Sequence, residues 1–283
     1  MNMTRECRQQ DEPITQGAKV AVLDIVKRSG WAILQYYSEI ASADSRHPLK
    51  VTRKEDQSPL TEADLASHKI IVSALSELTP HLPVISEEDG KRVSKYPAPE
   101  CFWLVDPLDG TKEFLAGSGE FTVNIALIWH GKSIFGVVGA PALDLIYWGG
   151  EGEGAFRIDG IMGGPIEIAL WPVSGRPVRI VASKSHMTPE TLAFAQRFKP
   201  NELIQAGSSL KFCRVAEGSA DLYPRLGPTC EWDTAAAQAV LEGAGGHVFD
   251  LEGRALRYGK KEILNPYFVA SSVSSEVILP GLS

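Results

Sequence analysis

The chain has 283 residues, of which 44% are hydrophobic and 22% charged, and its formal net charge at pH 7 is −7. This composition is typical of a folded globular protein and excludes a disordered or fibrous one. The acidic balance argues against a protein that grips a nucleic-acid polymer, which needs clustered Lys and Arg. It leaves room for a small phosphorylated ligand, because a bound divalent metal reverses the local field.

Neither a secretory signal nor a membrane span is predicted. Residues 1–16 are polar and charged, and nowhere do about 18 uncharged apolar residues run together. The four cysteines include no close-spaced pair, which argues against a zinc ribbon or a disulfide scaffold: Cys7, Cys101, Cys213 and Cys230. We therefore expect a protein of the reducing cytoplasm.

The N-terminal segment predicts two helices. Apolar residues mostly recur at helical spacing from Thr15 to about Ala41, which indicates one long amphipathic helix. The polar stretch Ser42–Ser58 is expected to be a loop. Thr61–Asp64 has the form of a capping box and predicts a second helix, closed by Pro80 and Pro83. Four apolar residues are expected to form its inner face: Leu65, Val72, Leu75 and Leu78.

Two short apolar runs, Pro83–Ile85 and Cys101–Val105, predict buried strands. Acidic residues follow each run: Glu87, Glu88 and Asp89 after the first, Asp106 and Asp109 after the second. Three more strands, separated by Gly and Pro turns, predict an antiparallel meander: Val123–Trp129, Ile134–Ala140 and Leu145–Trp148.

Beyond the glycine-rich stretch at residues 149–164, strands and helices are expected to alternate. A strand at Arg179–Ala182, a helix at Pro189–Phe198 with Thr188 as its N-cap, and an Ala-rich helix at Asp233–Glu242 are predicted. The length admits one large unit or two packed halves. We place a boundary near residue 150, between an N-terminal α+β half (residues 1–150) and a C-terminal α/β half (residues 151–283).

The segment from Trp103 to Thr111 is the most informative part of the chain. A predicted strand is followed by Asp106 and Asp109, and Pro107 stiffens the turn between them. The two acids are hard oxygen ligands that suit magnesium, while the backbone N–H groups of Gly110 and Thr111 are able to face a phosphate. The alternative is an ordinary surface turn, for which Asp, Pro and Gly are the usual residues.

The other acidic motifs are ambiguous when each is taken alone. The run Glu87–Asp89 is also typical of a solvated face. Asp233 is also explained as a helix N-terminal residue favoured by the helix dipole, and Asp64 as a capping residue.

Taken together, these motifs resemble those of the inositol monophosphatase superfamily of metal-dependent phosphatases. The resemblance rests on Glu87-Glu88, Asp106–Thr111, Trp232-Asp233 with its Ala-rich helix, and Gly245-Gly246, and it spans about residues 60–250. It implies a layered αβαβα sandwich, of mixed α+β and α/β character. Within the superfamily, three segments are most similar to the bacterial 3'(2'),5'-bisphosphate nucleotidases of the CysQ type: Ser58–Asp64, Gly207–Phe212 and Tyr223–Asp233.

The resemblance implies a site with two or three Mg²⁺ ions. Glu87, Asp106 and the backbone carbonyl of Leu108 would hold the first ion, and Asp106, Asp109 and Asp233 the second. Carboxylates gathered in one pocket raise each other's pKa unless divalent cations neutralise them, so metals make physical sense of the cluster.

Catalytic roles are implied for three residues. Asp64 would pair with the hydroxyl of Thr111, and Thr111 together with Glu87 would orient and deprotonate the attacking water. One metal ion lowers the pKa of water and the other stabilises the leaving oxygen, so the water is expected to attack phosphorus directly, without a phosphoenzyme.

Substrate recognition is expected to involve nearby residues of the C-terminal half. Lys211 and Arg225 would meet a 5'-phosphate, and Ser208 or Tyr223 the ribose or base. Lys211 as a helix surface residue and Tyr223 as part of the core are equally good interpretations. The full set of expected substrate contacts is Glu87, Leu108, Asp109, Gly110, Thr111, Ser208, Lys211, Arg225 and Asp233.

The activity implied is hydrolysis of adenosine 3',5'-bisphosphate to AMP and phosphate in sulfur assimilation, with 3'-phosphoadenylyl sulfate as a further substrate and inhibition by lithium. Inositol monophosphate hydrolysis at the same metal site and a non-catalytic regulator that binds a phosphorylated metabolite are the alternatives. The expected partner is a small nucleotide bisphosphate and not a nucleic-acid polymer. Peripheral association with the cytoplasmic side of the inner membrane and the oligomeric state are left open.

Overall fold

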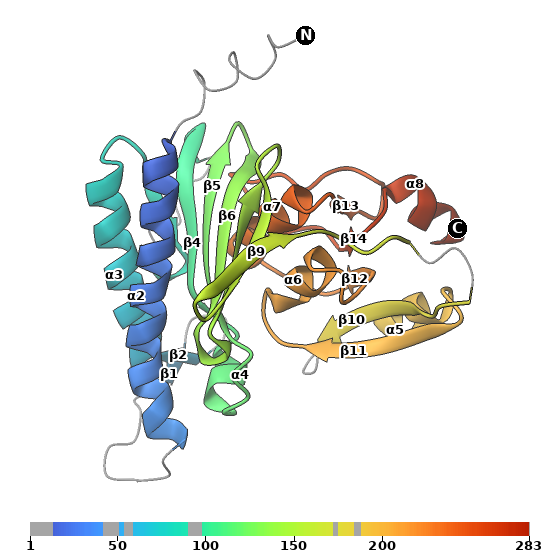
Figure 1. The fold of residues 1–283 in the computed structure, drawn as a ribbon, viewed down its shortest axis with the longest axis horizontal. Coiled ribbons are helices and arrows are strands. Elements are labelled where there is room, and N and C mark those ends of the chain that lie inside the picture. Colours follow the sequence, from blue (N-terminus) through green and yellow to red (C-terminus); the bar gives the residue numbers. More distant parts are fainter. Residues whose placement is uncertain are drawn as a thin grey trace.

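Two long helices form one outer layer of the molecule (Figure 1). The computed structural model describes residues 14–41, 51–53, 59–89, 98–171, 175–183 and 188–282. Helix α2 (Gln16–Ala41) confirms the predicted amphipathic helix, and helix α3 (Glu62–Leu78) begins after the predicted capping box at Thr61. The stretch expected to be a loop contains strand β1 (Val51–Arg53), which pairs with β2 (Pro59–Thr61). The rest of that stretch lies outside the described residues.

The inner face of α3 differs from the expected one. Leu65 is 48% exposed, so its assignment to the core is wrong, whereas Leu75 is buried as predicted. The residues that α3 buries include two polar ones: Ala63, Asp64, Ser67, Ile71 and Leu75. The buried face of α3 is therefore not a purely apolar stripe. It includes Asp64 and Ser67, whose side chains contact neighbouring polar groups.

Next to this layer lies a seven-stranded sheet in the order β3-β4-β5-β6-β7-β8-β9. Only β3 and β4 pair in parallel, and the remaining pairs are antiparallel, which confirms the predicted meander. The bounds are β3 (Val84–Ser86), β4 (Cys101–Asp109), β5 (Thr122–Trp129), β6 (Lys132–Ala140), β7 (Leu145–Gly150), β8 (Gly154–Asp159) and β9 (Met162–Ile166).

A second, five-stranded sheet has the order β11-β10-β12-β14-β13. Its bounds are β10 (Val178–Ser183), β11 (Asn201–Ala206), β12 (Leu222–Arg225), β13 (His247–Asp250) and β14 (Phe268–Ser271). The helices of this half are α5 (Pro189–Gln196), α6 (Leu210–Ala216), α7 (Ala235–Gly243) and α8 (Ser275–Ile278), and a short α4 (Thr111–Leu115) follows β4. The predicted strand near Arg179, the helix capped by Thr188 and the Ala-rich helix are confirmed. The Ala-rich helix begins at Ala235, however, and Asp233 lies in the short 3-10 helix η3 (Glu231–Asp233) before it and not in its first turn.

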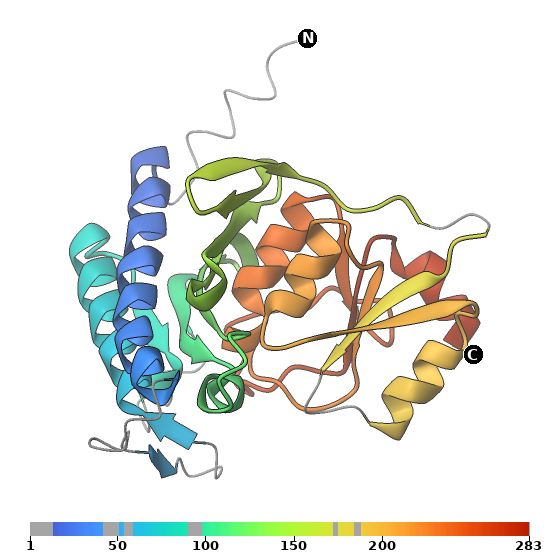
Figure 2. The same cartoon turned by 60° about the horizontal axis from the view of Figure 1, so that its bottom comes forward.

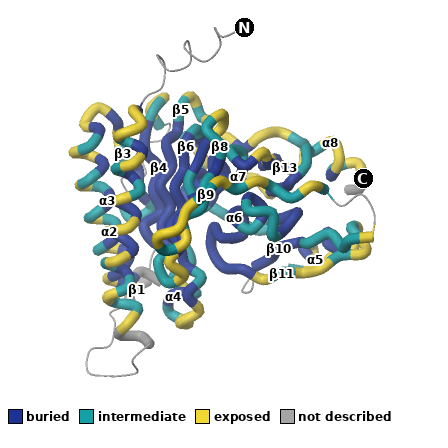
Figure 3. Tube along the Cα trace, in the orientation of Figure 1, coloured by how far each residue is buried: buried dark blue, intermediate teal, exposed yellow. Residues whose placement is uncertain are grey.

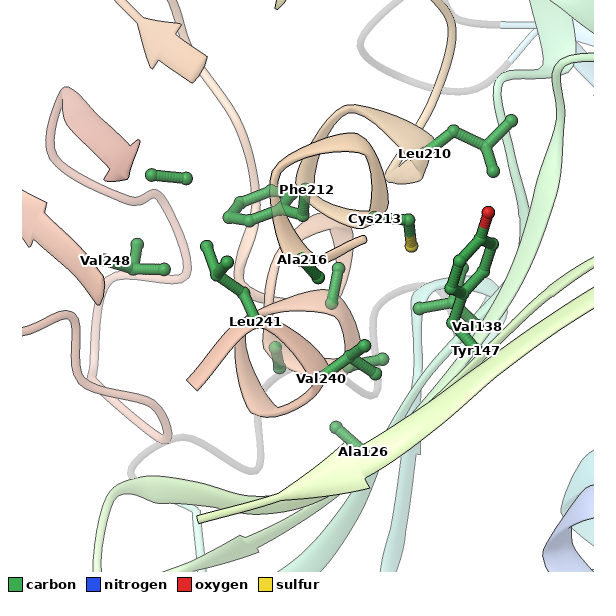
Figure 4. Close-up of a cluster of buried hydrophobic side chains, with 14 of the residues drawn as sticks. Ala126, Val138, Tyr147, Leu210, Phe212, Cys213, Ala216, Val240, Leu241 and Val248 are labelled. Carbon is green, nitrogen blue, oxygen red and sulfur yellow. The ribbon is translucent and has the colours of Figure 1, made fainter. Parts of the chain in front are cut away.

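Helices α6 and α7 fill the space between the two sheets, while α5 and α8 cover the outer side of the second sheet (Figures 1 and 2). The layers therefore follow the order αβαβα, as the resemblance implied. The residues between the sheets are buried, and Phe212, Val240 and Leu241 pack there with Tyr147 of the first sheet (Figures 3 and 4). None of the described helices is both long and apolar enough to cross a bilayer.

Glycine lets α7 lie directly on the first sheet. A Cβ atom at Gly136 would lie 2.1 Å from the carbonyl oxygen of Ala236, so only glycine fits there. This close approach brings the start of α7, and with it Asp233, towards the strand that carries Asp106. The division of the chain near residue 150 stays a prediction, and the passage from one sheet to the other lies between Ile166 and Val178.

Candidate functional site

Strand β4 positions the two acids of the central motif. The sequence predicted that the strand ends at Val105, but it continues to Asp109 and its register against β5 shifts between Asp106 and Asp109. Pro107 has no N–H to donate to the ladder, which accounts for the irregularity. The N–H of Leu108 instead donates to Asp106 Oδ1 at 3.0 Å, so the local backbone holds this buried carboxylate.

Gly110 ends the strand and begins α4. Its φ of +88° lies in the left-handed region, where glycine is favoured, and a Cβ atom there would contact Ser208 Cβ at 3.3 Å. The chain thus turns after Asp109, whereas the sequence predicted a turn between Asp106 and Asp109, where β4 continues instead. The binding of a phosphate by the N–H groups of Gly110 and Thr111 stays a prediction.

Asp64 contacts both its own helix and the central motif. Its Oδ2 accepts from the N–H of Thr61 at 2.8 Å, which completes the capping box. Its Oδ1 accepts from Thr111 Oγ1 at 3.4 Å, across 47 residues of sequence. The capping interpretation and the pairing with Thr111 are therefore both correct, and the catalytic role of the pair stays a prediction.

Asp109 is held by residues that the sequence analysis did not single out. The backbone N–H of Ser209 donates to Asp109 Oδ2 at 2.6 Å, and Thr122 Oγ1 lies 3.5 Å from the same oxygen. The hydroxyl of Ser209 lies 2.8 Å from that of Thr122 and donates to Asn124 Oδ1 at 2.8 Å. This polar bridge joins β5 to the start of α6, so it holds the segment Gly207–Phe212, where substrate contacts are predicted, against Asp109 of β4.

Four acids from three segments of the chain, Glu87, Asp106, Asp109 and Asp233, interact electrostatically at this point. Burial and then the neighbouring Glu87 raise the pKa of Asp106 well above its usual value, and Asp106 shares a hydrogen bond with Glu87. Burial and then Asp109 raise the pKa of Asp233 in the same way. The pKa of Asp109 rises to about 6, mainly through burial, although Lys211 and the N–H of Ser209 oppose the shift. The structure thus gathers the four side chains that the sequence predicted as ligands.

These residues suit a divalent cation. Among the described residues no three acidic, histidine or cysteine side chains form a ready-made metal site. Yet hard carboxylate oxygens are the donors that Mg²⁺ prefers, and mutual repulsion of buried acids is the cost that a bound cation removes. The donor set therefore fits magnesium, with Glu87, Asp106, the Leu108 carbonyl, Asp109 and Asp233 as the residues that would hold it.

A cavity of about 260 Å³ lies beside the acids, and Asp109, Thr111 and Asp233 form part of its lining. The interpretation of Lys211 as a helix surface residue is wrong, because its side chain is buried and lines this cavity. Lys211 Nζ donates to the carbonyl of Ser208 and lies 5.5 Å from the ring centroid of Tyr223. Burial lowers the pKa of Lys211 to about 8.

Two residues that line the cavity, Ser208 and Arg225, carry buried polar atoms without hydrogen-bond partners among the described residues. Arg225 Nη2 donates to the Pro228 carbonyl at 2.8 Å, but its buried Nε has no hydrogen-bond partner among the described residues. The buried Ser208 Oγ has none in that part of the chain either. Tyr223 is part of the core, as one interpretation held, and also lines the cavity. A second cavity of about 240 Å³ adjoins the first, and Ser183, Tyr223 and Arg225 line both.

The raised pKa values predict that the metal-free protein loses stability as the pH rises. A carboxyl whose folded pKa exceeds its unfolded value binds its proton more tightly in the folded state, so the free energy of unfolding falls above about pH 4. For Asp109 the loss is complete above its folded pKa of about 6. We expect a lower Tm at pH 8 than at pH 5 in chelator, and a smaller difference in Mg²⁺. A Tm in chelator that rises from pH 5 to pH 8 would contradict the raised pKa values of these carboxyl groups.

The chain is similar to known proteins over most of its length. The family model described as "Inositol monophosphatase family" matches residues 15–280. The protein named 3'(2'),5'-bisphosphate nucleotidase CysQ from Escherichia coli (strain K12) is 45% identical over 251 residues, which cover 88% of this chain and 98% of that protein. The protein of the same name from Salmonella typhimurium is 44% identical over 248 residues, covering 87% and 96%.

A solved structure is similar as well. The crystal structure of CysQ from Bacteroides thetaiotaomicron, described as a bacterial member of the inositol monophosphatase family, superposes with a TM-score of 0.75 at 38% identity. The match covers 93% of this chain and 100% of that one. The chain therefore belongs to the inositol monophosphatase family.

Proposed function

We propose that the protein is a phosphatase that hydrolyses the 3'-phosphate of adenosine 3',5'-bisphosphate to give AMP and phosphate. The relatives with 44% and 45% identity, matched over nearly their whole length, carry the name 3'(2'),5'-bisphosphate nucleotidase. We extend the proposal to 3'-phosphoadenylyl sulfate as a further substrate and to sulfur assimilation as the setting. The expected cytoplasmic location and peripheral membrane association stay predictions.

One observation carries the proposal. A single cavity is lined both by the acids Asp109 and Asp233 and by the basic residues Lys211 and Arg225, together with Tyr223. A nucleoside bisphosphate has the matching groups, because its 3'-phosphate needs metal-neutralised acids, its second phosphate needs cations, and its base stacks on aromatic rings. An inositol monophosphate has neither a second phosphate nor an aromatic ring.

In this proposal the metal site takes two or three Mg²⁺ ions. Glu87, Asp106 and the Leu108 carbonyl would hold the first, and Asp106, Asp109 and Asp233 would hold the second. Bound Mg²⁺ supplies Lewis-acid stabilisation of the charge that develops on the phosphoryl and leaving oxygens.

The chain's own residues position the attacking water. Asp64 accepts from Thr111 Oγ1 at 3.4 Å, and the same hydroxyl lies 3.4 Å from the carbonyl oxygen of Leu108. These contacts orient the Thr111 hydroxyl, so that it and Glu87 hold the water in line with the phosphorus and Glu87 takes its proton.

The substrate's remote groups contact the C-terminal half. Lys211 and Arg225 meet the 5'-phosphate, and Ser208 and Tyr223 contact the ribose or base. The unpartnered Ser208 Oγ and Arg225 Nε support this assignment, because buried polar atoms in proteins normally have partners and a polar ligand supplies them.

The identity of the products tests the proposal. With Mg²⁺ and adenosine 3',5'-bisphosphate, we expect inorganic phosphate and 5'-AMP in equal amounts by chromatography, because the 3'-phosphate lies against the acids while Lys211 and Arg225 retain the 5'-phosphate. Formation of 3'-AMP would contradict this orientation. Absence of phosphate release, with binding retained, would favour a non-catalytic regulator.

A further inference from the structure

One face of helix α3 contacts the site at three successive points. Asp64 accepts from Thr111, as described above. Ser67 Oγ donates to the carbonyl oxygen of Pro107 at 2.7 Å, and the next residue, His68, has its Nδ1 2.9 Å from Ser86 Oγ, directly before Glu87. Ser67 is fully buried, and no role has yet been assigned to it.

Ser67 and Asp106 are linked by hydrogen bonds to the same peptide group. The carbonyl of the Pro107–Leu108 peptide accepts from Ser67, and its N–H donates to Asp106 Oδ1 at 3.0 Å. A trans peptide group is planar, and its C=O and N–H point in opposite directions. Anchoring the carbonyl therefore fixes the direction in which the N–H meets the Asp106 carboxylate.

This peptide lies where the sheet gives least support. The register between β4 and β5 pairs Asp106 with Asn124 and Asp109 with Thr122, and no residue of β5 is registered opposite Pro107 or Leu108. The φ angle of Pro107 is fixed by its ring, so the rotation that remains is that of the peptide plane itself. The Ser67 hydroxyl restrains that rotation.

We propose that Ser67 is a positioning residue of the site, which sets the orientation of Asp106, and of the following Leu108 carbonyl, through the Pro107–Leu108 peptide. The proposal rests on the proposed function, since it concerns the residues that would hold Mg²⁺. Loss of the hydroxyl leaves a buried carbonyl without this donor and frees the peptide plane to rotate. The acids remain, but they are no longer held in one arrangement.

The test is direct Mg²⁺ binding by titration calorimetry, with Tm measured for each variant. We expect Ser67→Ala, and Ser67→Cys with its weaker donor, to bind Mg²⁺ about tenfold more weakly than the wild type. Ser67→Thr, which retains the hydroxyl, should bind within about threefold of the wild type. The matched control is Ser29→Ala: Ser29 is also fully buried in a helix and donates to a backbone carbonyl, that of Val26 at 3.0 Å.

A purely structural role predicts that Ser67→Ala and Ser29→Ala both lower the Tm and both leave Mg²⁺ binding unchanged. That result would overturn the inference while the proposed function survives. Equal loss of Mg²⁺ affinity in the two alanine variants would overturn it as well. A wild-type protein that binds no Mg²⁺ would overturn both the inference and the metal mechanism of the proposed function, so the two failures are distinguishable.

Discussion

Asp106→Asn is expected to lower kcat by at least about a thousandfold, equivalent to about 4 kcal/mol of transition-state stabilisation. Asp106 is buried, and it interacts with Glu87, Asp109 and Asp233, which places it at the centre of the acidic cluster. In the proposed site it is the side chain that would contribute to holding both metal ions. Its neutral isostere keeps an oxygen for the Leu108 N–H but loses the charge that the metals require.

The same substitution should stabilise the metal-free protein. The pKa of Asp106 is raised in the folded state, so ionisation of this carboxyl above about pH 4 favours the unfolded state, and a non-titrating Asn removes that cost. We expect a higher Tm than the wild type in chelator and a smaller fall of Tm between pH 5 and pH 8. Asp24→Asn, on the exposed face of α2, is the control that removes a charge remote from the site. Near-normal kcat in a folded Asp106→Asn protein would show that the site is wrongly assigned.

Removal of divalent metal is expected to abolish turnover, and Mg²⁺ should restore it fully. Without cations the four acids repel one another and any phosphate that approaches them. Ca²⁺ should inhibit, because it takes more ligands at longer distances than the octahedral geometry of Mg²⁺. The resemblance to the family also implies inhibition by Li⁺.

The measurement is phosphate release during titration with chelator, followed by addition of Mg²⁺ or Ca²⁺. Chelator already saturated with Mg²⁺ is the control for direct effects of the chelator. Full turnover in excess free chelator would contradict the metal mechanism and the assignment of the acidic cluster as a metal site.

The local motifs made much of the fold predictable. The capping box at Thr61, the helical spacing in α2 and the apolar runs of β4 to β6 depend on near neighbours, and these elements formed as expected. Strands β8 and β9 were missed because their glycines resemble turn residues. In the structure they extend the first sheet to Ile166.

The predicted metal ligands were found by recognising short motifs, but their supports depend on contacts between distant segments. Ser209 reaches Asp109 across 100 residues and Ser67 reaches Pro107 across 40. Helical spacing also misplaced Leu65, and it gave no sign that Lys211 is buried. The exposure of Leu65 and the burial of Lys211 depend on how the layers pack against one another. A periodic pattern in the sequence indicates only that one face of a helix is more apolar than the other.

The ratio of kcat/KM values across three phosphate esters tests the proposed activity most directly. Binding energy from the second phosphate and the base is able to orient the 3'-phosphate against the acids. We predict that kcat/KM for adenosine 3',5'-bisphosphate exceeds the values for inositol 1-phosphate and 3'-AMP by at least about tenfold, or about 1.4 kcal/mol. Lys211→Met should reduce this ratio, chiefly by lowering kcat/KM for adenosine 3',5'-bisphosphate. If inositol 1-phosphate proves an equal or better substrate, the nucleotidase assignment is wrong, and only a metal-dependent phosphatase remains.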